Sequence, residues 1–136
     1  MDAYDVLFSP AATARRLRER YEAIGWPVVF AAEERCVTSG PDGALCAGSG
    51  GQTNADEASP YRYLNSGALL GAAGALRALF TRHAWAEPVE DMFWWGKVWQ
   101  REHETVVVDG ARRLFACPSR AVRAGGKDVS IGDTMI

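Results

Sequence analysis

Residues 26–32 of this chain read Trp-Pro-Val-Val-Phe-Ala-Ala, and this stretch decides the fold class. An unbroken apolar run of this length is typical of a strand covered on both faces, as in α/β proteins. Before it, apolar residues recur at helical spacing from Ala14 to Ile24, and Gly25 ends the pattern. Residues 2–8 read as the end of an earlier strand. Strand, helix and strand together predict a βαβ unit, hence an α/β fold with parallel pairing.

Further along the chain, the pattern predicts two more helices and another strand. The helices are expected at Ser66 to about His83 and at Val89 to about Arg101, and the strand at Thr105 to Asp109. Residues 33–60 read as a long irregular segment, and residues 121–136 as an irregular tail.

Local signals refine these boundaries. Ser9 is a suitable N-cap for the first helix. Gly71 and Gly74 fall within the second expected helix and weaken its propensity by about 1 kcal/mol each. We therefore expect both glycines to allow close approach of neighbouring backbone.

Composition limits the class of protein. The chain has 136 residues, enough for one domain, and its net charge of −2 gives no basic surplus for a nucleic-acid partner. No apolar run approaches the roughly 20 residues of a transmembrane helix. No signal peptide is recognised, because Asp2 and Asp5 stand where a basic leader is expected. Cys36 and Cys46 bracket a glycine-rich loop and are expected either to pair or to remain free thiols.

The first candidate site is the acidic pair Asp2 and Asp5, at the end of the first expected strand. Two carboxylates three residues apart can both reach one cation, and their hard oxygens suit Mn²⁺ or Mg²⁺. Open α/β sheets bind ligands at this edge. The alternative is an exposed pair of charges near a chain terminus.

Two further polar groups stand at expected helix starts. Asn65, Ser66 and Gly67 offer side-chain donors and acceptors, with a glycine that lets a ligand approach. The alternative is an ordinary N-cap formed by Ser66. Glu90 and Asp91 open the aromatic helix, either as carboxylates facing a reacting sugar or as acids that favour the helix dipole.

Taken in order, these motifs resemble the glycosyltransferase domain of the procollagen lysyl hydroxylase/glycosyltransferase family. The resemblance covers residues 2 to about 116 and is most specific at Tyr61–Gly71, which is similar to the family's Arg-Tyr/Phe-Leu-Asn-Ser-Gly-Gly-Phe-Ile-Gly segment. The matching segments are Asp2–Phe8, Val28–Glu33, Tyr61–Gly71, Glu90–Trp95 and Val108–Phe115.

The resemblance implies a GT-A, Rossmann-like fold with a mixed sheet and flanking helices. It also implies a UDP-sugar donor held through Mn²⁺ or Mg²⁺, and a hydroxyl acceptor on a glycan or protein, including collagen-type hydroxylysine. The implied location is the endoplasmic reticulum or Golgi lumen, or outside the cell. The implied site residues are Asp2 and Asp5 on the metal, Tyr4 against the uridine, Asn65, Ser66 and Gly67 around the donor sugar, and Glu90 and Asp91 as catalytic acids.

The chain departs from the family pattern at three places. The family's metal-binding His falls on Gly110, and Met92 replaces a Gln after a shortened acidic run. Residues 1–120 are expected to form a transferase-like domain without the family's N-terminal nucleotide-binding half. Three interpretations stay open: a metal-dependent glycosyltransferase, a non-catalytic transferase-like module that binds a glycan or protein, and an incomplete fragment.

Overall fold

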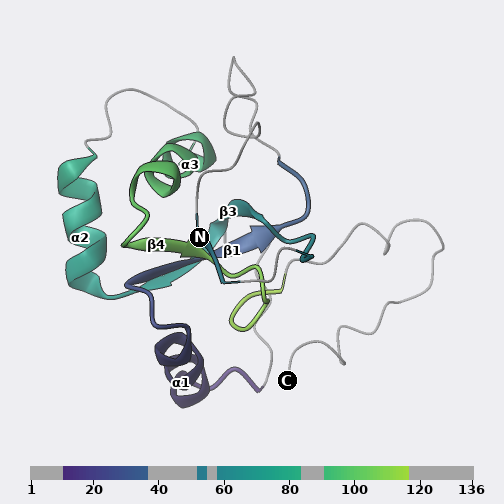
Figure 1. The fold of residues 1–136 in the computed structure, drawn as a ribbon. Helices are drawn as coiled ribbons and strands as arrows, with labels where there is room; N and C mark the ends of the chain where they lie inside the picture. Colours follow the sequence, from purple (N-terminus) through teal and green to yellow (C-terminus); the bar gives the residue numbers. More distant parts are fainter. Residues whose placement is uncertain (1–10, 37–51, 55–57, 84–90, 117–136) are drawn as a thin grey trace.

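The computed structural model describes residues 11–36, 52–54, 58–83 and 91–116. Within these ranges, three helices surround a four-stranded sheet, with α3 and α1 on opposite sides of it (Figure 1). The α/β class with a mixed sheet and flanking helices is therefore confirmed. The first expected strand and the C-terminal tail lie outside the described residues.

The sheet has the order β2-β4-β1-β3. Strand β4 pairs in parallel with both of its neighbours, whereas β1 and β3 are antiparallel. The parallel pairing expected for residues 2–8 with 26–32 lies outside the described residues, and the parallel partner of β1 that the structure does show is β4. The strands are β1 (Val28–Glu33), β2 (Gln52–Thr53), β3 (Tyr63–Gly71) and β4 (Val106–Val108).

Helix α1 (Ala14–Ile24) begins later than its sequence signal suggests. Its N-cap is Thr13, whose Oγ1 accepts a hydrogen bond from the Arg16 N–H at 3.3 Å, and so Ser9 does not cap it. The predicted end is confirmed: Gly25 adopts the left-handed conformation with φ of 76°, which costs a glycine little.

The expected helix from Ser66 to His83 is wrong in its first half. Residues Tyr63–Gly71 form β3, and α2 spans only Ala73–Arg82. Residues 63–65 and 69–71 of β3 pair with the buried strand β1, and this tertiary contact overrides the helical spacing of its leucines. Ser66 is therefore not a helix N-cap.

Gly71 sits where β3 passes the start of β1. A Cβ at Gly71 would lie 3.0 Å from the Pro27 carbonyl oxygen and 3.0 Å from Val28 Cγ2, so the predicted close approach is confirmed there. Gly74 has nothing within 4 Å of its would-be Cβ, so the same expectation is wrong for Gly74.

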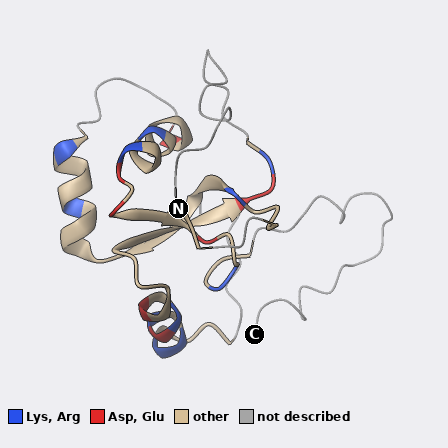
Figure 2. Cartoon of the chain, viewed as in Figure 1, with Lys and Arg blue, Asp and Glu red and all other residues tan. Residues whose placement is uncertain are grey.

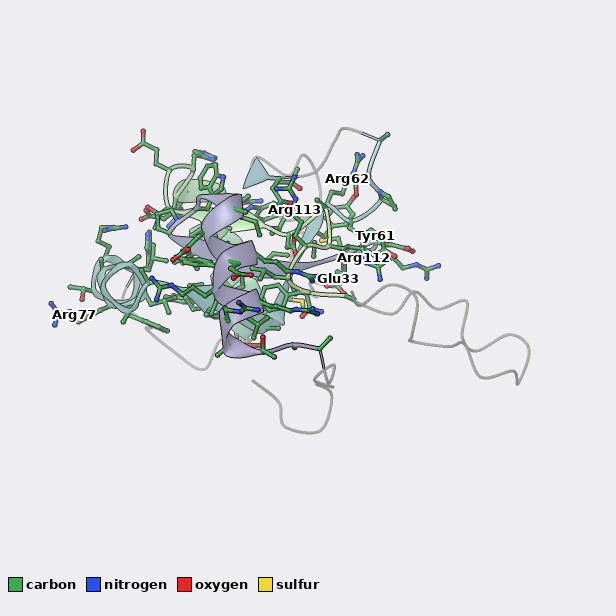
Figure 3. All side chains as sticks on the ribbon, turned by 90° about the horizontal axis from the view of Figure 1, so that it is seen from below. Glu33, Tyr61, Arg62, Arg77, Arg112 and Arg113 are labelled. Carbon is green, nitrogen blue, oxygen red and sulfur yellow. The ribbon has the colours of Figure 1, made fainter. Side chains whose placement is uncertain are left out.

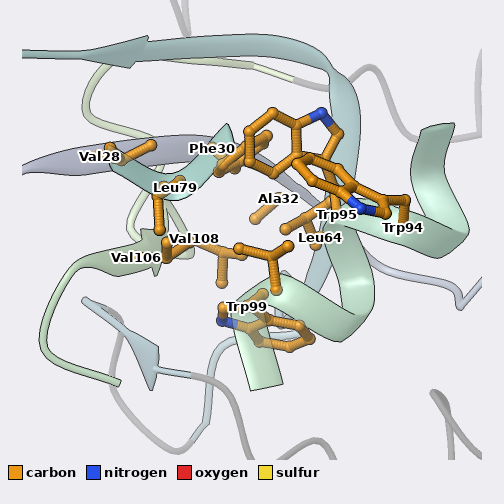
Figure 4. Close-up of a cluster of buried hydrophobic side chains, with 11 residues drawn as sticks. Val28, Phe30, Ala32, Leu64, Leu79, Trp94, Trp95, Trp99, Val106 and Val108 are labelled. Carbon is orange, nitrogen blue, oxygen red and sulfur yellow. The ribbon is translucent and has the colours of Figure 1, made fainter. Parts of the chain in front are cut away.

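An aromatic helix covers one face of the sheet, as shown in Figure 4. Helix α3 (Asp91–Arg101) buries Trp94, Trp95 and Trp99, and the ring centroids of Trp95 and Phe30 lie 4.8 Å apart. Such pairs add about 0.5–1.5 kcal/mol to the burial of their area. We call this cluster the aromatic core; it comprises Val28, Phe30, Ala32, Leu64, Leu79, Trp94, Trp95, Val98, Trp99, Val106 and Val108.

The opposite face of β1 and β4 carries Val29, Ala31 and Val107, because successive side chains of a strand alternate between faces. Helix α1 lies on this side in Figure 1. Its Tyr21 hydroxyl donates to the Pro27 carbonyl at 2.8 Å and accepts from the Ala72 N–H at 3.1 Å. This single side chain ties α1 to the starts of β1 and α2.

Candidate functional site

Polar side chains gather where the parallel strands end. Glu33 is the last residue of β1, Asn54 follows β2, and Asp109 follows β4. Because β3 runs antiparallel to β1, its first residue, Tyr63, pairs with Glu33 at the same edge. Open α/β sheets bind their ligands at the carboxyl ends of parallel strands. We call this region the polar edge; it comprises Glu33, Asn54, Tyr61, Asn65, Asp109, Gly110 and Arg112.

The Asn65-Ser66-Gly67 motif forms a bulge in β3. Phe30 pairs with Leu69 but Ala31 pairs with Asn65, so residues 66–68 have no counterpart on β1. Inside the bulge, the Asn65 Oδ1 accepts a hydrogen bond from the Gly67 N–H at 2.8 Å. A Cβ at Gly67 would lie 2.9 Å from that same oxygen, so the folded-back Asn65 requires glycine there.

The bulge places the Asn65 side chain against Glu33. Ala31 and Glu33 point to the face opposite the aromatic core, where the Asn65 side chain acts on the Glu33 carboxyl. Burial raises the pKa of the Glu33 carboxyl, while the hydrogen bond to Asn65 partly offsets that rise. Its Oε1 is buried without a hydrogen-bond partner among the described residues. Glu33 therefore has one buried carboxyl oxygen that accepts no hydrogen bond from the described residues.

Asp109 organises the loop that follows β4. Its carboxylate is fully buried and accepts hydrogen bonds from the backbone N–H groups of Arg113, Leu114 and Phe115 at 2.6–2.9 Å. Asn54 adds a fourth bond, from Nδ2 to the Asp109 Oδ1 at 3.2 Å. Burying a carboxylate costs little free energy when hydrogen bonds within the protein replace those it made with water.

The same loop is held from other directions. The Asn54 Oδ1 accepts from the Ala111 N–H at 3.0 Å, and the Ser59 hydroxyl donates to the Gly110 carbonyl at 2.9 Å. Arg20 of α1 donates from Nη1 to the Arg113 carbonyl at 3.0 Å. The loop is thus fixed from three separate segments of the chain.

Arg112 stands in this loop with φ of 55°, the only non-glycine residue at positive φ in the described ranges. Its guanidinium lies over the Tyr61 ring, 4.6 Å from the centroid, and Nη1 donates to the Tyr61 hydroxyl at 3.2 Å. The Arg112 Nε is buried and has no hydrogen-bond partner within the described part of the chain. Figure 3 shows Glu33, Tyr61 and Arg112 in the same region of the molecule.

The position that the resemblance assigns to the family's metal-binding His carries no side chain. Gly110 offers only its carbonyl, which already accepts from Ser59. No group of three or more His, Cys, Asp or Glu able to hold a metal occurs among the residues that the structure describes. The other expected ligands, Asp2 and Asp5, lie outside those residues.

Of the remaining expected site residues, Tyr4 and Glu90 also lie outside the described ranges. Asp91 begins α3 and is exposed, and its Oδ1 accepts from the Met92 N–H at 2.8 Å. This is what an acid in a first helical turn does. No hydrogen bond among the described residues joins Asp91 to Asn65 or to Glu33.

Sequence reasoning did not single out Glu33, Asn54, Asp109 or Arg112 as site residues. For Glu33 and Asp109 a signal existed, since each directly follows an apolar strand. For Asn54 and Arg112 there was none, because their roles depend on β2 pairing with β4 and on backbone conformation.

Comparison with protein-family models gave one decisive finding. The model of the PLOD GT domain matches residues 1–123. The chain belongs to the PLOD glycosyltransferase-domain family. The comparisons with curated proteins and with solved structures gave no match.

Family membership agrees with the architecture of the described residues. This PLOD GT domain shows the mixed sheet and flanking helices of a partial GT-A-like fold. A glycosyltransferase-like function implies a sugar donor and an acceptor.

Three other properties of this PLOD GT domain bear on its surroundings. No helix in the described ranges has the length and apolar character needed to cross a membrane. Cys36 is disulfide-bonded, and its partner lies outside the described residues. Charges of both signs share the exposed surface of α1, where Arg15–Glu19 and Arg18–Glu22 form ion pairs (Figure 2). The mixture agrees with a solvated helix face.

Proposed function

We propose that this PLOD GT domain is a Mn²⁺-dependent glycosyltransferase that moves a sugar from a UDP-sugar to a hydroxyl acceptor. The observation that carries the proposal is the family match over residues 1–123, in a chain whose polar edge lies where α/β folds bind ligands. The acceptor hydroxyl belongs to a glycan or a protein, including collagen-type hydroxylysine. The disulfide at Cys36 supports a site of action in the secretory lumen or outside the cell.

The donor sugar is assigned to the bulge of β3. The Asn65 Oδ1 accepts a hydrogen bond from the Gly67 N–H at 2.8 Å, so the side-chain amide has a fixed direction. Fixed hydrogen-bonding groups position a sugar ring more effectively than mobile ones, because less freedom is lost on binding. Ser66 and Gly67 complete this pocket in the proposal, and Tyr4 lies against the uridine.

The metal is assigned to Asp2 and Asp5, whose oxygens suit Mn²⁺ or Mg²⁺. When bound, the metal would neutralise charge on the leaving diphosphate. Gly110 supplies no imidazole, so the remaining positions would be filled by water or donor oxygens. Glu90 and Asp91 are assigned to the acceptor side as the catalytic acids.

The test is titration calorimetry of UDP into the purified protein, with Mn²⁺ and with EDTA. Manganese-dependent binding that disappears in Asp5→Ala supports the donor site. Asn65→Ala should weaken UDP-sugar more than UDP, because only the sugar contacts Asn65. Equal loss of both ligands would show that Asn65 has a structural role, and manganese-dependent binding retained in Asp5→Ala would remove Asp5 from the site.

A second candidate, a non-catalytic module that binds a glycan or protein, is favoured by Gly110 at the position of the family's metal ligand. Release of UDP from UDP-sugars during incubation separates the two. Turnover that requires Mn²⁺ establishes the enzyme, whereas a folded protein that binds glycans and ignores UDP establishes the binding module.

A further inference from the structure

We propose that the guanidinium of Arg112 binds the diphosphate of the nucleotide-sugar donor and supplies positive charge beside the position where the family's imidazole is replaced by Gly110. The inference rests on the proposed function, since it names the residue that holds one part of the donor.

The loop that carries Arg112 is rigidly held at the polar edge. The Asp109 carboxylate accepts hydrogen bonds from the backbone N–H groups of the three residues after Arg112, which are Arg113, Leu114 and Phe115. The Ser59 hydroxyl donates a hydrogen bond to the Gly110 carbonyl. The Arg112 N–H itself donates to the Asp109 carbonyl at 2.9 Å. A cation on such a loop is positioned before a ligand arrives, which lowers the entropy lost on binding.

The backbone of Arg112 is strained, and the strain has no evident structural use. A left-handed conformation costs a residue with a Cβ roughly 1–2 kcal/mol. Residues held in this way by their surroundings cluster at ligand sites. The fold nevertheless keeps an arginine here, where glycine would adopt the same φ without cost.

The guanidinium is oriented but not neutralised. It stacks on Tyr61 and donates one hydrogen bond to that residue's hydroxyl, yet no ion pair joins it to any carboxylate in the described ranges. Its Nε has no acceptor among the described residues, and an unpaired buried donor costs about 1–3 kcal/mol. Arginine presents a planar fork of N–H groups that matches phosphate oxygens.

Neighbouring arginines do not share these properties. Arg62 donates from Nε and Nη2 to the Ser59 carbonyl at 3.2 and 3.0 Å, so its fork is used within the protein. Arg113 is exposed. Figure 3 labels all three side chains.

Glu33 at the same edge selects among phosphate ligands. Its carboxylate repels a bare phosphate but can accept hydrogen bonds from sugar hydroxyls, and its Oε1 has no donor within the part of the chain that the structure describes. A nucleotide sugar carries both a diphosphate and hydroxyls. Arg112 and Glu33 therefore complement the two halves of that ligand class.

The test compares Arg112→Gln with Arg113→Gln, which removes the same charge one residue further along the same loop. Affinities for UDP, uridine and inorganic pyrophosphate are measured by calorimetry in Mn²⁺ and in EDTA. Arg112→Gln should weaken UDP and pyrophosphate about 10- to 100-fold, the range of a charge-assisted hydrogen bond, and leave uridine unchanged. Arg113→Gln should change all three less than about twofold.

Thermal unfolding of each variant checks that it is folded. If Arg112→Gln fails to fold, Arg112→Lys takes its place, because lysine keeps the charge but loses the fork and should retain intermediate affinity. Equal effects of the Arg112 and Arg113 variants, or loss of uridine together with UDP, overturn the proposal.

The inference and the proposed function can fail separately. If the wild-type protein binds pyrophosphate through Arg112 but ignores UDP, the anion site stands and the UDP donor is wrong. If it binds UDP with Mn²⁺ and Arg112→Gln binds equally well, the proposed function stands and the role of Arg112 is wrong. Binding of neither UDP nor pyrophosphate overturns both.

Discussion

The aromatic core and the polar edge are built on the same strands, β1 and β4, yet they differ in how completely their buried groups find partners. In the core, Phe30 and Val108 are fully buried against the tryptophans of α3. Glu33 at the end of β1 and Arg112 in the loop after β4 each keep a buried polar atom with no partner among the described residues. Arg112 also holds a strained backbone.

The difference separates what stabilises this protein from what it is shaped to bind. Natural sequences agree with their fold at every level except at functional sites, where strain and unpaired polar groups persist. The core therefore should respond to substitution through stability. The polar edge should respond through binding.

The largest expected effect is in the core. Phe30→Ala should lower the free energy of unfolding by about 3–5 kcal/mol, because it removes a fully buried ring and leaves a cavity. Urea unfolding followed by tryptophan fluorescence measures the loss. Phe80→Ala is the matched control, since Phe80 is 51% exposed while still stacking on Trp94. Similar losses in the two variants would contradict the placement of the core.

Asp109 belongs to the polar edge, but its substitution is expected to lower the stability of the fold. Asp109→Ala should cost about 3 kcal/mol, since three backbone N–H groups and the Asn54 amide lose their acceptor. Asp109→Asn keeps one carbonyl oxygen and should lose less. Urea unfolding of both variants tests this order, and wild-type stability in Asp109→Ala would show that the loop is not anchored there.

Gly67 tests the bulge directly. Gly67→Ala should destabilise by about 1 kcal/mol, because its Cβ would displace the Asn65 Oδ1 and cost the hydrogen bond from the Gly67 N–H. The penalty should shrink when Asn65→Ala is combined with it. Gly74→Ala has open space around its Cβ and should instead be neutral or stabilising. Thermal unfolding of the wild type, Gly67→Ala, Asn65→Ala and the double variant measures the coupling between the two positions. A Gly67→Ala penalty that persists in the Asn65→Ala background would point to another contact.

The smallest effect concerns pH. The pKa of Glu33 is raised in the folded protein, so the fold favours its protonated form. Stability from this group is therefore complete below the unfolded value, near pH 4.3, and is lost as pH rises through the folded pKa. Glu33→Gln should remove that loss and gain stability relative to wild type at pH 7 compared with pH 4. Glu34→Gln, at an exposed neighbouring position, should leave the profile unchanged, and identical profiles for both variants would contradict the burial of Glu33.

Elements with strong local signals could be predicted from the sequence. The run Val28–Glu33 is a buried strand, Gly25 ends α1, and α3 runs to Arg101 as its aromatic pattern indicates. In each case the local preference and the tertiary environment favour the same structure.

Elements that depend on distant partners could not be predicted. Strand β3 was expected as helix because Leu69 and Leu70 fit a helical stripe, but its pairing with β1 is a long-range contact. Strand β2 has two residues and exists only through β4. The bulge at Asn65 and the left-handed Arg112 likewise follow from pairing and loop anchoring, which no local pattern encodes.

The most direct test of the polar edge as the ligand site is chemical-shift mapping by NMR, with UDP added in the presence of Mg²⁺. The account predicts that the amide signals of Gly67, Gly110 and Arg112 move on titration, while the indole signals of Trp95 and Trp99 stay in place. Shifts concentrated on those tryptophans, with the edge unchanged, would contradict it.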